Sequence, residues 1–152
     1  MKKIILAFIG VLILISCQNN TKINLKETFE NSTWNKFKTI GFKFQMLKGV
    51  QYQTKIKVEY LPQYEYSDLK IQYELISPDG ESKLSYYTIP MIDAQGKSLG
   101  KSKDGHLVTE TIVSKKDFIN SVSEYKILID NVMPKYNTEN ILSIEVEMES
   151  LK

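Results

Sequence analysis

The side chains that could carry out covalent chemistry in this chain are few and far apart. The chain has one cysteine, Cys17, and one histidine, His106. A nucleophilic site of the Ser-His-Asp or Cys-His kind places a histidine beside the nucleophile, so it would have to use His106. That residue directly follows the turn residues Asp104-Gly105, which favours an exposed or turn-capping histidine. The sequence therefore predicts no catalytic residue.

Carboxylates are the other candidate reactive groups. Glu145, Glu147 and Glu149 occupy alternate positions, which would place them on one face of a strand in steps of about 7 Å. A catalytic pair needs two carboxylates in different environments, so this row is interpreted as a solvated face. A zinc site needs several Cys or His ligands, and Asp93 with Asp104 matches no calcium-loop spacing. We expect no metal and no cofactor.

Cys17 ends a segment of a different kind. Lys2 and Lys3 precede a run of 12 mostly aliphatic residues, 4–15. This pattern is typical of a secretory signal, and the run is too short to cross a bilayer as a helix. Residues 14–17, Leu-Ile-Ser-Cys, resemble the lipobox of bacterial lipoproteins. The resemblance implies acyl chains on Cys17, and more than one chain gives stable anchoring. The alternative is an ordinary signal peptide with an incidental cysteine.

Length and composition limit the rest of the chain to one domain. We expect a signal peptide at 1–16, a short lipid-anchored tether at 17–25 and a folded domain at 26–152. A domain of that size can bury a core without staples, and no second cysteine is present for a disulfide. The 20 basic residues are all lysine and face 18 acidic ones. The balanced charge and the lack of arginine exclude a nucleic-acid-binding protein.

Alternation of apolar and polar residues dominates this domain. Turn-forming residues separate the alternating segments, at Pro78-Asp79-Gly80, 93–96 and 103–105. The pattern predicts an all-β fold, an antiparallel β-sandwich of the jelly-roll or immunoglobulin-like kind with about seven to eight strands. The segments expected as strands are 40–46, 55–60, 69–75, 84–89, 107–113, 125–132 and 144–149. Residues 114–117, Ser-Lys-Lys-Asp, resemble a helix start and predict a short helical turn.

Aromatic residues are the remaining candidates for binding. Trp34 is the only tryptophan, and Tyr64 and Tyr66 follow Pro62 in a tyrosine-rich stretch. Such rings on the surface of a sandwich can stack on sugars or anchor a partner protein. The alternative is that they close the ends of the core. Trp34, Tyr64 and Tyr66 are therefore candidate partner or glycan contacts.

An ordered set of features across the domain resembles the gliding-motility lipoprotein family GldH of Bacteroidetes. The set consists of Cys17, Trp34, Tyr64 to Leu69, Pro78-Asp79-Gly80, Asp93 to Gly100, Met133 and Ile141 to Val146. The resemblance implies an outer-membrane lipoprotein needed for gliding or for the linked type IX secretion machinery. Such a protein would be a structural or assembly component with no reaction of its own. Its partners would be other motility or secretion lipoproteins or envelope proteins.

Two functions therefore stand side by side. The first is a non-enzymatic lipoprotein that docks against envelope proteins. The second is a carbohydrate-binding lipoprotein that holds glycan on tyrosine or tryptophan rings. No acidic run follows Cys17, so we expect the periplasmic side of the outer membrane. Fold alone does not choose between these functions, because β-sandwiches host many.

Overall fold

The computed structural model describes residues 21–45, 48–118 and 123–151, so Cys17 and the segment 1–16 lie outside the described residues. Within these ranges the chain forms eleven strands and one short 3-10 helix. The strands are β1 Lys22–Thr28, β2 Thr33–Asn35, β3 Ile40–Gln45, β4 Gln51–Tyr60, β5 Asp68–Ile76, β6 Ser82–Pro90, β7 Lys101–Lys103, β8 His106–Phe118, β9 Glu124–Asn131, β10 Asn137–Glu139 and β11 Ile141–Ser150; the helix η1 is Glu30–Ser32. None of the described residues forms a helix long and apolar enough to cross a membrane.

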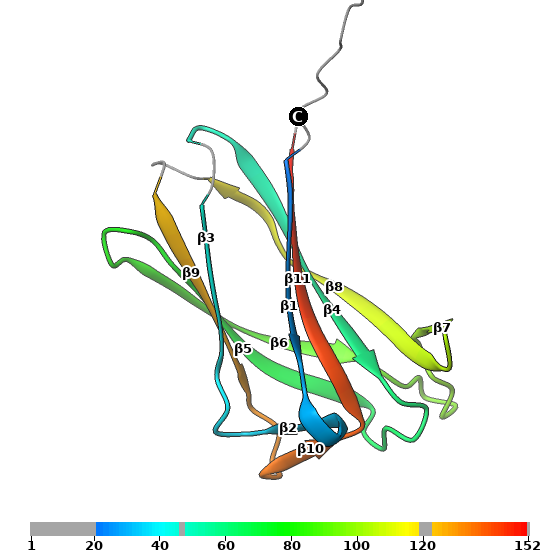
Figure 1. Ribbon diagram of the computed structural model, residues 1–152. Coiled ribbons are helices and arrows are strands. Elements are labelled where there is room, and N and C mark those ends of the chain that lie inside the picture. Colours follow the sequence, from blue (N-terminus) through cyan, green and yellow to red (C-terminus); the bar gives the residue numbers. More distant parts are fainter. Residues whose placement is uncertain (1–20, 46–47, 119–122, 152) are drawn as a thin grey trace, which may run out of the picture.

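The strands build two layers and a small cap. One sheet has five strands in the order β1-β11-β4-β8-β7, and the other has four in the order β3-β9-β5-β6. A third, two-stranded sheet pairs β2 with β10. Every pairing between strands is antiparallel. Figure 1 shows the two larger sheets facing each other, with β2 and β10 across one end. This confirms the predicted all-β sandwich.

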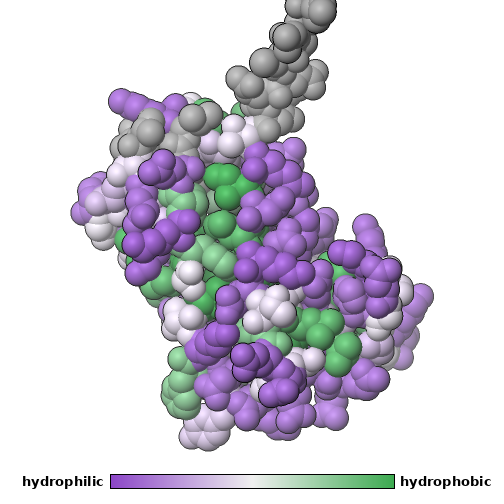
Figure 2. Space-filling model, in the orientation of Figure 1, coloured by the Kyte–Doolittle hydropathy of each residue, from purple (hydrophilic) through white to green (hydrophobic). Residues whose placement is uncertain are grey.

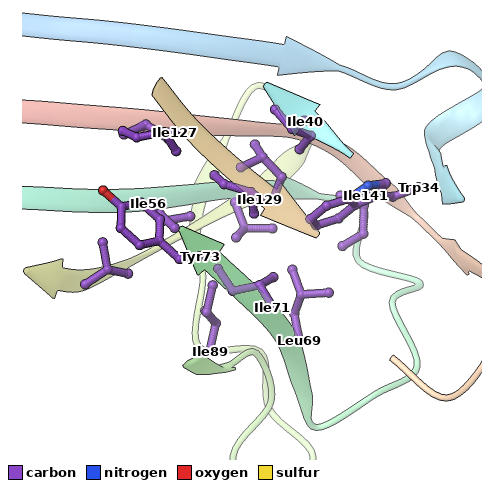
Figure 3. Close-up of a cluster of buried hydrophobic side chains, with 14 of the residues drawn as sticks. Trp34, Ile40, Ile56, Leu69, Ile71, Tyr73, Ile89, Ile127, Ile129 and Ile141 are labelled. Atoms are coloured by element: carbon purple, nitrogen blue, oxygen red, sulfur yellow. The ribbon is translucent and has the colours of Figure 1, made fainter. Parts of the chain in front are cut away.

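The core lies between the two sheets, as the alternation predicts. On β4 and β11, Ile56, Val58, Ile144 and Val146 are fully buried, and their neighbours in sequence are more exposed. The four-stranded sheet supplies the opposing side chains, which Figure 3 shows meeting those of β4 and β11. They include Ile40, Leu69, Ile71, Ile89, Ile127 and Ile129. Branched aliphatic side chains suit these positions because they pack well on a pleated surface.

The extra strands come from segments that the alternation did not single out. β2, β7 and β10 have three residues each, which is too short for a periodic signal. β1 begins at Lys22, within the span expected as tether, so part of that span is a strand paired with β11. The turns at Gly80, Gly96 and Gly105 are present, and all three glycines have positive φ. Glycine adopts such angles without steric cost.

The helical turn predicted at 114–117 is wrong. These residues continue β8, where Ser114 pairs with Thr54 and Asp117 pairs with Tyr52. The register shifts on both sides of Thr54, which shows an irregularity in the ladder at this point. A local capping pattern is worth about 1 kcal/mol. Pairing with the long strand β4 outweighs that preference.

One of the three carboxylates of β11 departs from the solvated face that the sequence predicts, whereas Glu145 and Glu149 are partly exposed. Glu147 is 4% exposed. Lys22 of β1 approaches it at 2.9 Å, Lys57 of β4 hydrogen-bonds to it, and Lys55 lies 3.9 Å away. β11 runs between β1 and β4, so lysines on both neighbours fold their stems over the carboxylate. The hydrogen bond from Lys57 lowers the pKa of Glu147, and the same bond raises the pKa of Lys57.

Candidate functional site

The two ends of the sandwich differ in what they present. The beginning of β1 and the end of β11 lie together at one end, and β2 and β10 lie at the other (Figure 1). We call the second end the loop end and define it by residues 34–38, 61–67 and 134–140. Cys17 precedes β1 by only a few residues in the sequence.

A buried layer gives the loop end its rigidity. Trp34 of β2 is 0% exposed, its indole N–H donates to the Lys38 carbonyl at 2.9 Å, and its ring stacks on Phe29 at 5.2 Å. The buried amide of Asn131 donates to the Trp34 carbonyl at 3.0 Å and to Thr138 Oγ1 at 2.8 Å. These bonds join β9 to both strands of the cap. The buried layer therefore holds the surface residues of the loop end in place.

Two aromatic rings stand outside this layer. Phe37 is 77% exposed and Tyr136 is 69% exposed, and their ring centroids are 5.7 Å apart. The backbone beneath them is hydrogen-bonded: Phe37 N donates to Asn35 Oδ1 at 2.9 Å, and Lys36 N donates to the Tyr136 carbonyl at 2.7 Å. Large exposed rings on an ordered backbone lose little entropy when a partner covers them. We call this the aromatic pair.

A small polar pocket lies at the same end. Its volume is about 60 Å³, far below the roughly 300–1,000 Å³ of usual small-molecule sites. The ammonium group of Lys135 lies 5.6 Å from the centre of the Tyr66 ring, within cation–π range. A hydrogen bond with Tyr66 raises the pKa of Lys135, and the charges of Glu65 and Glu139 act in the same direction. The pocket is lined by Glu65, Tyr66, Lys135, Asn137, Glu139 and Asn140.

The structure separates the three aromatic residues that the sequence proposed as contacts. Tyr64 and Tyr66 meet, with ring centroids 5.5 Å apart. Tyr64 is buried, however, and its hydroxyl donates to the Asp68 carbonyl at 2.8 Å. Burial raises the pKa of Tyr64 well above its usual range, with the Asp68 charge acting in the same direction. Tyr66 is half-buried and lines the pocket. Because Trp34 and Tyr64 present almost no surface, the core role left open for them fits this structure.

Phe37 and Tyr136 are the residues that sequence reasoning missed. Both lie outside the alternating segments, in short stretches between strands. The available signal for an exposed ring was a large aromatic residue that stands beside lysine in a segment between strands. Phe37 lies between Lys36 and Lys38, and Tyr136 follows Lys135. Binding residues often lie in loops that a rigid scaffold holds in position.

The remaining candidates for chemistry stay apart from one another. His106 Nε2 lies 4.0 Å from Glu59 Oε1 on the outer face of the five-stranded sheet. Asp93 Oδ1 accepts backbone N–H groups of Gln95 and Lys97, at 3.0 and 2.8 Å, and so closes its own turn. Among residues 21–45, 48–118 and 123–151, no group of three or more His, Cys, Asp or Glu side chains could hold a metal. The loop end, with its exposed rings and polar pocket, is therefore the candidate site.

Comparisons with known proteins agree with the sequence pattern. A family model described as GldH lipoprotein matches residues 22–148. No curated protein matches the chain. One similar solved chain, from "Structure of infectious bursal disease virus Gx strain", is 8% identical with a TM-score of 0.31. That match covers 87% of this chain and 31% of the other, and at this TM-score it carries no argument.

Proposed function

Because this chain belongs to the GldH lipoprotein family over residues 22–148, we propose that it is a non-enzymatic docking component of a gliding-motility assembly. In this proposal Cys17 carries the lipid that holds the protein at the outer membrane, on the periplasmic side. The loop end binds another motility or type IX secretion lipoprotein, or a different envelope protein. The observation that carries the proposal is the exposed aromatic pair at the end opposite the start of β1.

The energetics of the aromatic pair support a protein partner. Aromatic side chains dominate the binding energy of many protein interfaces, especially where they already lie in their bound geometry. Phe37 and Tyr136 touch each other on a hydrogen-bonded backbone, so little ordering remains when they bind. Their exposure costs stability that burial would recover, at about 25 cal/mol for each Å² of apolar surface covered. No reacting group is needed for this role.

The test is a pull-down in mild detergent of the tagged full-length protein from its native membrane. We expect the wild type to recover motility or secretion proteins and the double variant Phe37→Ala, Tyr136→Ala to lose them. The matched control is Leu84→Ala with Tyr86→Ala, which removes two exposed apolar side chains from β6. Equal recovery by all three proteins would reject the loop end as the docking surface. Protease treatment of whole cells tests the orientation, since digestion without lysis would mean surface exposure.

Carbohydrate binding is the second candidate, and the pocket beside Tyr66 is what favours it. Asn137, Asn140, Glu65 and Glu139 line this pocket together with Tyr66, and their amide and carboxyl groups are of the kind that hydrogen-bond to sugar hydroxyls. The pocket is too small to enclose a sugar ring, so a glycan would have to lie across the ring at the surface. A glycan array separates the two functions. Binding that Tyr66→Ala removes, while Phe37→Ala keeps it, would favour the carbohydrate role.

A further inference from the structure

The two long edges of the sandwich are closed to different degrees. On one side the Tyr87 hydroxyl of β6 donates to the Val113 carbonyl of β8 and ties the two sheets together. On the other side β1 ends the five-stranded sheet and β3 ends the four-stranded sheet. Among the described residues β1 pairs only with β11, and β3 pairs only with β9. Figure 1 shows β1 and β3 as the facing edge strands of this side, which we call the open edge.

Apolar side chains reach the surface along the open edge. Ile23 and Leu25 of β1 and Phe42 of β3 pack against the core but are only half-buried. In Figure 2, which has the same orientation, hydrophobic residues form a band between the positions of β1 and β3. Polar residues border the band on both sides. An additional strand placed here would cover the band with its inward-facing side chains.

The backbone of β1 also offers hydrogen bonds at this edge. Ser150 N donates to the Thr21 carbonyl, and Phe29 N donates to the Leu142 carbonyl, so the odd-numbered residues of β1 bond to β11. In an antiparallel pair, successive residues of a strand direct their N–H and C=O groups to opposite sides. The N–H and C=O groups of Lys22, Asn24 and Lys26 therefore point out of the sheet. Such a free edge is a template for another strand.

On its outer face β1 carries two lysines, opposite the glutamates of β11. Lys22 and Lys26 are 47% and 42% exposed, and they contact Glu147 at 2.9 Å and Glu59 at 2.7 Å. Each ammonium group has three N–H donors, so a second carboxylate can bind beside the first. A strand added to β1 would place its outward side chains next to these lysines. Acidic side chains are therefore favoured there, and basic ones are repelled.

From these three observations we infer that the open edge of β1 accepts an extended segment of a partner protein, in which apolar and acidic residues alternate. The apolar side chains cover Ile23, Leu25 and Phe42, and the acidic ones meet Lys22 and Lys26. Main-chain bonds to Lys22, Asn24 and Lys26 supply the pairing, as in other cases of strand addition. This surface is distinct from the loop end and does not depend on the role proposed for the aromatic pair.

A peptide of known composition tests the inference directly. The probe is a capped nine-residue peptide alternating glutamate and valine, added to the full-length protein in detergent. Amide hydrogen exchange is read at Asn24 and Lys26, whose N–H groups point out of the sheet. At about ten times its Kd, the peptide should slow exchange at both by about tenfold. No slowing, or equal slowing by a peptide alternating lysine and valine, would overturn the inference.

Two proline variants locate the pairing strand. Proline is tolerated on an edge strand where its N–H would face solvent, and it removes that donor. Asn24→Pro should abolish binding of the glutamate peptide. Val132 N donates to the Lys70 carbonyl, so the even-numbered residues of β9 bond to β5 and the odd-numbered ones bond to β3. In the register of β3 with β9, the backbone N–H and C=O groups of Lys43 therefore point out of the sheet. Lys43→Pro is thus the matched control and should bind as the wild type does. The reverse result would refute pairing with β1.

If Asn24→Pro does not fold, reversing the charge of the β1 lysines tests the same inference. The double variant Lys22→Glu, Lys26→Glu should lose the glutamate peptide and gain the lysine peptide. Lys126→Glu, on the outer face of the other sheet, should leave both affinities unchanged. If the double variant still prefers the glutamate peptide, the β1 lysines do not select acidic residues, and a partner segment of this composition is refuted.

Discussion

The loop end contains two groups of aromatic residues that differ in burial rather than in type. The inner group, Phe29, Trp34 and Tyr64, is buried, and its polar atoms are hydrogen-bonded. The outer group, Phe37 and Tyr136, is exposed, and its two rings contact each other. The same residue type therefore serves folding in one layer and is available for recognition in the next. Substitutions in the inner group should lower stability more than binding, and substitutions in the outer group should lower binding more than stability.

The largest effect is expected for Trp34→Ala. The indole is fully buried against Phe29, and its removal leaves a cavity beneath the cap and an unpaired carbonyl at Lys38. Truncation of a buried Trp costs about 3–5 kcal/mol. Urea unfolding followed by circular dichroism measures this, since Trp34 is the only tryptophan and its fluorescence is lost. Tyr136→Ala is the control, and similar losses for both would break the distinction between the layers.

Asn131→Ala should have the next largest effect. Its side-chain amide donates to the Trp34 carbonyl and to Thr138 Oγ1, and its Oδ1 accepts Met133 N at 2.9 Å. Removing it takes away all three bonds and leaves the buried Met133 N–H without this partner, at a cost of about 2–3 kcal/mol. The unfolding midpoint in urea measures the loss, with exposed Gln95→Ala as the control. A loss no larger than that of the control would mean that the cap does not depend on this amide.

A smaller, pH-dependent effect is expected for Glu147→Gln on the outer face of the five-stranded sheet. The hydrogen bond from Lys57 lowers the pKa of Glu147, so the carboxylate stabilises the fold above the ordinary pKa of 4.5 and loses that contribution as the pH falls through its lowered value. Because the lysines around it remain partly exposed, we expect a loss of about 1 kcal/mol at pH 7. The loss should shrink as the pH falls below 4.5.

Unfolding of Glu147→Gln and wild type between pH 3 and pH 7 checks this prediction. Glu81→Gln, which removes a glutamate charge from an exposed turn, is the control. A constant difference at all pH values would mean that the side chain acts through packing and not through its charge. Glu147 would then stabilise the fold by packing, as the buried aromatic residues of the inner group do.

Much of the fold could be predicted because apolar and polar residues alternate along a strand that has one face buried in a sandwich. Ile56 and Val58 on β4, and Ile144 and Val146 on β11, are apolar positions of segments expected as strands, and all four are fully buried. The helical turn at 114–117 was wrong because pairing of Ser114 and Asp117 with a neighbouring strand outweighs a local capping pattern. Burial of Glu147 could not be predicted, since it depends on which strands lie beside β11.

The candidate site was predicted less well, for a related reason. Tyr66 reaches the surface and Trp34 does not, yet the sequence offers both as candidate contacts. Whether an aromatic ring is covered depends on contacts between residues far apart in the chain, such as the pairing of Thr138 with Trp34. Phe37 and Tyr136 meet through the same pairing, although about a hundred positions separate them. A single sequence shows no sign of that meeting.

The smallest effect on stability is expected for Phe37→Ala. The ring is 77% exposed, and the backbone of its turn is held by Asn35, whose Oδ1 accepts Phe37 N and whose carbonyl accepts Lys38 N. The substitution keeps both bonds, so the change in unfolding free energy should stay within about 0.5 kcal/mol. The same urea series measures it beside Trp34→Ala. A large loss would show that the outer ring supports the cap, and the aromatic pair could then no longer be treated as a surface free to bind.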